Sequence, residues 1–273
     1  MTRSKTASAQ IIRPGPIGYV EYEIDIEAAL RRDLPRLVSD VSIAPLTIEA
    51  INQLPEGAKG AYVLFLDEKP IYAGKTDVRH GFRDRLSRHF YTIRNRENLD
   101  PSRIGFKAIR IMVFSNFDVE AILIHEMRKA DKKVLAWNYS GFGSNDPGHN
   151  REGQRPSKFD FEYPINIDRE LRLFEPGPHQ LLPMLIHLKE NLPYYFRYET
   201  DLLPGKKKPE HYTKGHADQR SAAMVPVDAG DSVRNLLNKA RKVLPEGWQV
   251  SLFPGRVILY KESTIYKHRS EAF

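Results

Sequence analysis

The chain has 273 residues, no cysteine and a formal net charge of +7 at pH 7. Disulfide frameworks and thiolate metal sites are therefore excluded, and no run of about 18 apolar residues is present that would span a membrane. The basic balance favours a polyanionic partner such as nucleic acid, although a generally basic surface gives the same net charge.

The first part of the chain is expected to form a tail and an arm. Residues 1–10 are polar and basic without the apolar stretch of a secretory signal, which predicts a disordered tail on a cytoplasmic protein of bacterial type. Apolar and acidic residues alternate over 20–26, as in a half-buried strand, and 27–38 carry a helical stripe interrupted by Pro35. We interpret residues 1–58 as an arm for dimerisation or DNA contact.

Two short apolar runs follow, at 60–66 and 70–76, with a polar spacer between them. This pattern predicts a β-hairpin with a loop of about three to five residues. Each arm of the hairpin carries one tyrosine, Tyr62 and Tyr72. Tyrosines on strands are usually half-buried packing residues, so either one alone would favour a structural role.

Two helices and another strand are predicted beyond the hairpin. Residues 82–91 form the first helix, in which Arg85 and His89 lie one turn apart and therefore on one face. Residues 106–115 form a strand beside the hairpin, and 118–132 form the second helix. The predicted fold class is α+β, with a small mixed β-sheet flanked by helices.

This ordered set of residues resembles the GIY-YIG nuclease superfamily. The two tripeptides that give the family its name stand here as Gly60-Ala61-Tyr62 and Tyr72-Ala73-Gly74, with alanine where the family usually has isoleucine. The resemblance also depends on Arg85 in the first helix, and on Glu126 in the second helix followed twelve residues later by Asn138.

The resemblance implies a role for each of these residues. Tyr62 would be the general base toward the attacking water, helped by a nearby cation because the ordinary phenol pKa is about 10. Tyr72 would orient water or phosphate. Arg85 would hold two phosphate oxygens, and His89 would act as an acid or a hydrogen-bond donor. Asn138 would support the geometry of the site.

Glu126 is predicted to be the metal ligand. The competing carboxylate, Glu120, follows the helix N-cap Asp118 and falls in the first turn, where negative charge is favourable, so it has a structural explanation. A single carboxylate among oxygen ligands suits Mg²⁺, for which Mn²⁺ would be able to substitute. One carboxylate also points to one metal ion in each active site.

A glycine-rich polar run begins after Asn138, and its plain interpretation is a flexible linker. Long loops inside a domain tend to be functional, however. The pattern over Gly141–Gly148 is similar to a segment of the type II restriction endonuclease branch of the superfamily, whose members cut short GC-rich palindromes.

Side chains that suit phosphates or base edges are predicted to contact DNA. They are Lys75, Arg83, Arg88, Asn150, Arg151, Gln154, Arg155 and Lys158.

We divide the chain into the arm, a nuclease core with its recognition loop at 59–168, and a C-terminal α+β subdomain at 169–273 in which no catalytic motif is recognised. The resemblance implies a sequence-specific endonuclease of double-stranded DNA that acts as a homodimer or higher even oligomer, because cutting both strands of a palindrome needs two sites related by a two-fold axis. The alternatives are a repair or homing nuclease of the same superfamily and a non-catalytic DNA-binding protein with a nuclease-like core.

Overall fold

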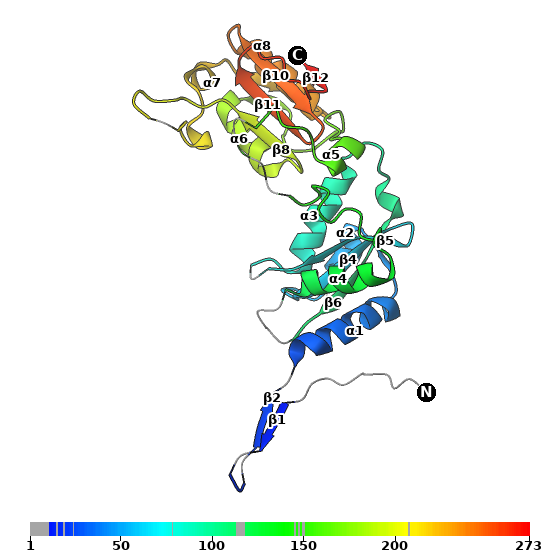
Figure 1. The fold of residues 1–273 in the computed structure, drawn as a ribbon. Coiled ribbons are helices and arrows are strands. Elements are labelled where there is room, and N and C mark those ends of the chain that lie inside the picture. The colour runs from blue at the N-terminus through cyan, green and yellow to red at the C-terminus, as the bar shows by residue number, and fades with distance from the viewer. Residues whose placement is uncertain are drawn as a thin grey trace. The chain divides into compact units, whose positions relative to one another are not determined.

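The structure is a computed structural model that describes residues 11–14, 16–18, 20–23, 25–77, 79–112, 118–144, 146, 148, 151–206 and 208–273. The chain has an α+β fold, as predicted (Figure 1). It divides into two compact units, the first of Met1–Phe90 with Asp100–Tyr139 and the second of Tyr91–Leu99 with Ser140–Phe273. The loop after Asn138 therefore belongs to the second unit, and not to the core to which its sequence position assigned it.

The sheet of the first unit is built around the predicted hairpin. Its strands β3 (Ala44–Pro45), β4 (Gly60–Leu66), β5 (Lys69–Lys75) and β6 (Ile104–Arg110) lie in the order β3-β6-β4-β5. All three pairings are antiparallel, so the prediction of a mixed sheet is wrong for this unit. The hairpin turn has only two central residues, both with positive φ, which matches a type I′ turn and the right-handed twist of the strands.

Most helices of the first unit begin at a local capping signal in the sequence. These helices are α1 (Ile26–Asp40), α2 (Ile48–Asn52), α3 (Phe82–Arg94) and α4 (Val119–Ala130). The side chains of Asp25, Thr47 and Asp118 accept hydrogen bonds from the first turns of α1, α2 and α4. Pro35 lies inside α1 without ending it, contrary to the predicted interruption.

Successive residues of β4 face opposite sides of the sheet. Ala61, Val63 and Phe65 pack in one cluster with buried residues of α1 and α4. Tyr62 points to the other side, where its ring lies 6.5 Å from that of Phe82 in α3. The strand alternation therefore directs Tyr62 toward α3 and separates it from the main apolar cluster.

A two-stranded hairpin precedes α1, formed by β1 (Ile11–Pro14) and β2 (Val20–Glu23). A 3-10 turn, η1 (Pro101–Arg103), leads into β6. In the described part of the chain, no helix combines the length and the apolar character needed to cross a membrane.

The second unit has its own sheet and its own core. Strands β8 (Tyr195–Tyr198), β10 (Trp248–Phe253), β11 (Arg256–Lys261) and β12 (Glu271–Ala272) lie in the order β12-β10-β11-β8, with β8 parallel to β11. Strands β10 and β11 form an antiparallel hairpin that turns at Pro254 and Gly255. A smaller pair joins β7 (Gly177–His179) to β9 (Val225–Val227).

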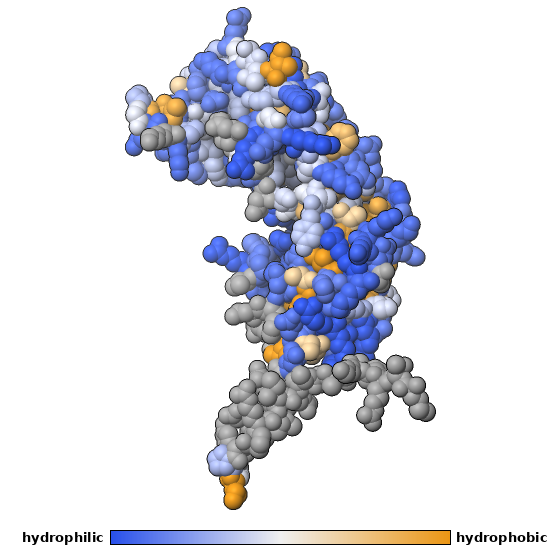
Figure 2. Space-filling model, viewed as in Figure 1, coloured by the Kyte–Doolittle hydropathy of each residue, from blue (hydrophilic) through white to orange (hydrophobic). Residues whose placement is uncertain are grey.

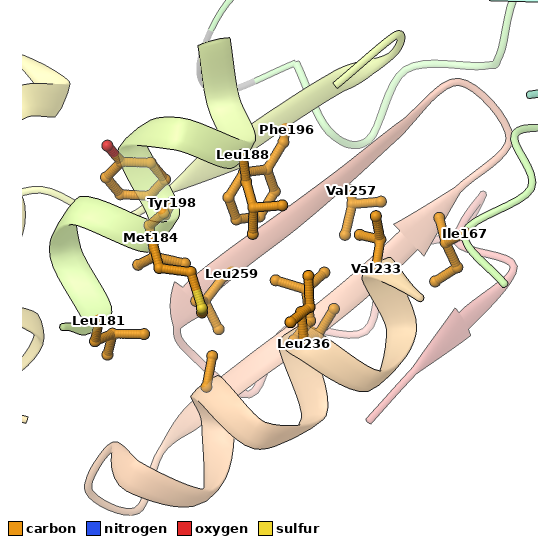
Figure 3. Packing of buried hydrophobic residues seen from close by; sticks show 14 of the residues in the cluster. Ile167, Leu181, Met184, Leu188, Phe196, Tyr198, Val233, Leu236, Val257 and Leu259 are labelled. Carbon is orange, nitrogen blue, oxygen red and sulfur yellow. The ribbon is translucent and has the colours of Figure 1, made fainter. Parts of the chain in front are cut away.

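Two helices cover one face of this sheet, α6 (Leu181–Asn191) and α8 (Val233–Val243). Figure 3 shows Leu188 and Leu236 from these helices with Val257 and Leu259 from β11 in one cluster of buried side chains. The remaining helices are short: α5 (Lys158–Glu162), α7 (Ala217–Ser221) and the 3-10 turn η2 (Tyr212–Lys214). The face drawn in Figure 2 is mostly hydrophilic, with small separate apolar areas.

Candidate active site

Three aromatic rings from three elements meet on the α3 side of the first sheet. They belong to Tyr62 on β4, Tyr72 on β5 and His89 on α3. The hydroxyl of Tyr62 lies 2.8 Å from Nε2 of His89, and the ring centroids of Tyr72 and His89 lie 5.3 Å apart. All three side chains are buried. The structure thus brings together the two tyrosines and the histidine that the sequence selected.

The glycines of the two tripeptides have a steric reason. A Cβ on Gly74 would lie 2.6 Å from the hydroxyl oxygen of Tyr62, so only glycine leaves room for that phenol to cross β5. A Cβ on Gly60 would lie 2.0 Å from the carbonyl oxygen of Ile109, at a backbone φ of +156°. Each glycine therefore stands where a side chain would collide with a neighbour, and Gly74 is the one that makes room for the Tyr62 hydroxyl.

Burial keeps the Tyr62–His89 pair uncharged. It raises the pKa of Tyr62 above the ordinary phenol value, an effect that the Arg85 charge opposes. It also lowers the pKa of His89 to about 3, and Arg85 and Arg88 add to this effect. At neutral pH the site therefore holds a neutral phenol that is hydrogen-bonded to a neutral imidazole.

Arg85 brings a cation to this pair. Its guanidinium lies close to the phenols of Tyr62 and Tyr72. Burial acts to lower the pKa of Arg85, but these phenols and Asp77 outweigh that effect and raise it. Its Nε is buried and has no hydrogen-bond partner. A buried N–H without a partner costs about 1 to 3 kcal/mol, so such a group in a cluster of this kind suits an anionic ligand.

Glu120, and not Glu126, is the carboxylate at the cluster. Burial first, and then repulsion from Asp118, raises the pKa of Glu120, whereas the charges of Lys75 and Arg85 lower it. The Glu120 charge also acts to raise the pKa of both Tyr62 and Tyr72. The backbone of Lys75, at the end of β5, also acts to lower this pKa, so the carboxylate lies near the end of that strand.

Glu126 is tied into a different set of contacts. Its carboxylate accepts hydrogen bonds from Nζ of Lys129 at 2.6 and 2.8 Å and from Arg31 in α1 at 3.2 Å. The bond from Lys129 is the main cause of its lowered pKa. Six helical positions separate Glu126 from Glu120, which turns the two side chains to different sides of α4. The structure therefore does not place the predicted metal ligand with the tyrosines.

Asn138 holds the strand that carries Tyr72. Its side-chain Oδ1 accepts from the N–H of Ala73, and its Nδ2 donates to the carbonyl of Ala73, both at 2.8 Å. The backbone N–H groups of Leu135 and Trp137 donate to carbonyls of the same strand. This is the supporting position that the resemblance implied, at the residue that follows Tyr72.

The predicted DNA contacts of the first unit differ in how free their side chains are. Lys75 is bound to Asp118 at 2.9 Å, and Nε of Arg83 donates to the carbonyl of Leu54 at 2.7 Å, so Arg83 has a structural role. Arg88 is exposed on α3.

The other predicted DNA contacts fall in the second unit. Asn150 lies outside the described residues. The remaining four side chains are exposed there, and they belong to Arg151, Gln154, Arg155 and Lys158.

Comparison with known proteins finds no family model that matches the chain and no curated protein that matches it. What can be concluded about function therefore comes from the geometry of the cluster formed by Tyr62, Tyr72, Arg85, His89 and Glu120.

Proposed function

We propose that the chain is an endonuclease that hydrolyses phosphodiester bonds of double-stranded DNA. The observation that carries this proposal is the convergence of the Arg85 guanidinium, with its unpartnered buried Nε, and the half-buried Glu120 carboxylate on the neutral Tyr62–His89 pair. Phosphodiester hydrolysis needs a cation at the phosphate, a path for the proton of water and charge compensation for the leaving oxygen.

Arg85 would bind the phosphate. Its planar fork matches two oxygens of a phosphate group, and the negative charge that develops in the transition state would be stabilised in a partly desolvated place. The N–H at Nε that lacks a partner would then gain one.

The Tyr62–His89 pair would carry the proton of the attacking water. As water attacks phosphorus, its proton passes to the Tyr62 oxygen while the phenol proton passes to Nε2 of His89, 2.8 Å away. The Arg85 charge helps to depress the pKa of His89, and a bound phosphate would offset that charge. The imidazole would thus become a better base when substrate is present.

Glu120 is the residue that would hold Mg²⁺, the cofactor implied by a nuclease of this kind. Mg²⁺ keeps several of its waters and needs only one or two carboxylates besides the substrate phosphate. The half-buried Glu120 carboxylate, which the Arg85 charge reaches, would supply one such ligand. The ion would supply positive charge at the phosphate and at the leaving oxygen.

A pair of matched variants on α4 tests this proposal. Glu120→Gln removes the charge at the cluster, and Glu126→Gln removes the same charge from the Arg31–Lys129 contacts. With plasmid DNA and Mg²⁺, we expect Glu120→Gln to lower the cleavage rate by about 10³-fold or more, because a metal ligand and its charge are lost. Glu126→Gln should cut at close to the parent rate. Equal rates for the parent and Glu120→Gln would contradict the assignment.

The products of the same digest test whether the endonuclease is of the restriction type. A sequence-specific enzyme that acts as an even oligomer gives discrete fragments with uniform ends, cut in both strands. Cleavage confined to branched DNA would point to a repair nuclease, and tight binding without cleavage at any divalent metal would point to a non-catalytic binding protein.

A further inference from the structure

The two ends of the segment from Gly141 to Ser157 lie together. The N–H of Phe159 donates to the carbonyl of Ser140 at 2.9 Å, and a Cβ on Gly141 would lie 2.3 Å from Oγ of Ser157. The rings of Phe142 and Phe159 pack at the base of the loop with their centroids 4.8 Å apart. Loops with touching ends and packing of their own are frequently functional.

Strand β8, in the sheet of the second unit, binds this loop through its side chains. Arg197 donates through Nε and Nη2 to the carboxylate of Asp146 at 2.8 and 2.7 Å, and its Nη1 lies 3.7 Å from Glu152. The hydroxyl of Tyr195 donates to the carbonyl of Ser144 at 2.6 Å. The Arg197 side chain is 12% exposed, so this two-pronged contact is largely shielded from water.

Strand β11 holds the loop at a second place. Tyr260 donates through its hydroxyl to Glu152 at 3.2 Å, and Arg256 donates to the carbonyl of Arg151 at 2.9 Å. The side chain of Glu152 is 5% exposed. A buried carboxylate is tolerated only with partners of this kind, so both acidic contacts pull the loop onto the sheet.

The acidic and the basic side chains of the loop and of the first residue of α5 face different surroundings. The carboxylates of Asp146 and Glu152 turn toward the sheet, while the side chains of Arg151, Arg155 and Lys158 are exposed. Within the described ranges, neither arginine nor the lysine forms an ion pair. Exposed cations of this kind suit a polyanion with regularly spaced phosphates.

We propose that Arg197 is a positioning residue for DNA recognition. By fixing both carboxylates of the loop on the sheet, it presents Arg151, Arg155 and Lys158 together to the phosphates and base edges of duplex DNA. This inference rests on the proposed function, and it gives the C-terminal part of the chain the task of supporting the recognition loop. Arg197 acts through the loop and not on the DNA itself.

Asp146→Asn separates positioning from simple electrostatics. The substitution removes one negative charge from the loop, so a purely electrostatic contribution predicts tighter binding of DNA. A positioning role predicts weaker binding, because the two-pronged contact with Arg197 is lost. We expect the Kd for a fluorescein-labelled linear duplex of mixed sequence to rise at least about tenfold. An unchanged or lower Kd would overturn the inference.

Arg197→Met and Arg172→Met form a second, matched comparison in the full-length chain. Both remove one arginine, but Arg172 is 91% exposed and pairs with Glu170 away from the loop. Arg197→Met should weaken duplex binding at least about tenfold, and Arg172→Met should change it less than about twofold. Hydrogen exchange should show loss of backbone protection over 151–159 in Arg197→Met alone. Equal Kd values for the two variants would reject the proposal.

The binding measurements are made in the Glu120→Gln background, so that their outcome does not depend on cleavage. If the parent chain does not cleave DNA but Arg197→Met still weakens binding, the nuclease proposal fails and the role of the loop stands. If the parent chain cleaves DNA but binding does not depend on Arg197, the nuclease proposal stands and the role of Arg197 is rejected.

Discussion

The fold holds the His89 imidazole in its neutral form. The residue is 4% exposed, and burial with the help of Arg85 and Arg88 lowers the pKa of His89 to about 3. A neutral ring leaves one nitrogen lone pair available to the Tyr62 hydroxyl. The proposed proton path depends on this neutrality, because Nε2 must be free of a proton to accept the one from the phenol.

This neutrality makes the stability of the protein depend on pH in a defined direction. The unfolded chain takes up a proton at His89 near pH 6.5, whereas the folded chain does so only near pH 3. Between these values the unfolded state binds more protons, so His89 contributes a loss of up to about 1.4 kcal/mol in the free energy of unfolding for each unit that the pH falls.

Urea unfolding of the parent and of His89→Phe at several pH values from about 6.5 down to 4 measures this contribution. The phenylalanine variant lacks the titrating ring, so its stability should fall less steeply as the pH is lowered. Parallel curves for the two proteins would show that His89 titrates alike in the folded and unfolded states.

At the scale of elements, residues 135–138 act as an added edge of the first sheet. Leu135 and Trp137 donate to carbonyls of β5, and Asn138 closes the pairing with two side-chain bonds to Ala73. This edge lies directly beside Tyr72. The position of that phenol in the cluster therefore depends on a side chain that takes no part in the proposed chemistry.

Asn138→Ala should release this edge. Removing the amide leaves a buried N–H and a buried C=O of Ala73 without partners, which is expected to lower the free energy of unfolding by about 2 to 4 kcal/mol. Asn191→Ala is the matched control, because its exposed amide bonds to the carbonyl and to the ring nitrogen of one neighbour, His187, and its loss should cost about 0.5 kcal/mol. Chemical unfolding of both variants checks the difference, and equal losses would contradict the role of Asn138.

Local signals in the sequence predicted most of these elements. Two apolar runs with a polar spacer predicted the β4–β5 hairpin, and the cap residue Asp118 marked the start of α4. The assignment of Glu126 as the metal ligand depended on more than local signals, because it used a fixed spacing to Asn138. The sequence alone does not show that the first turn of α4 lies against the end of β5, where Lys75 stands beside Glu120. A carboxylate explained by its cap position can also serve the site.

For the whole molecule, the predicted boundary after residue 168 was too late. The loop after Asn138 is joined to Arg197 and Tyr260, which follow it by many positions in the chain. Such pairings between distant residues leave no local pattern. The same holds for residues 91–99, which fall inside the core predicted at 59–168 and which the structure assigns to the second unit.

Arg96 is the residue that binds this short segment into the second unit. Its side chain is 8% exposed, donates to Asp160 at 2.7 Å and to the carbonyl of Tyr163 at 2.9 Å, and lies over the ring of Phe159. Burial lowers the pKa of the guanidinium, and the Asp160 charge opposes this effect. Removing one partner of a buried ion pair leaves the other charge uncompensated, which costs about 3 to 5 kcal/mol.

Arg96→Met should therefore destabilise the second unit more than the first. We expect backbone amides of α5 and of the β10–β11 hairpin to exchange hydrogen much faster in this variant, while amides of β4 and β5 keep their protection. Arg94→Met removes the same charge two residues earlier, from an exposed side chain, and should leave exchange unchanged in both units. Equal acceleration in both units would mean that they unfold as one cooperative body, and that residues 91–99 are not specifically part of the second.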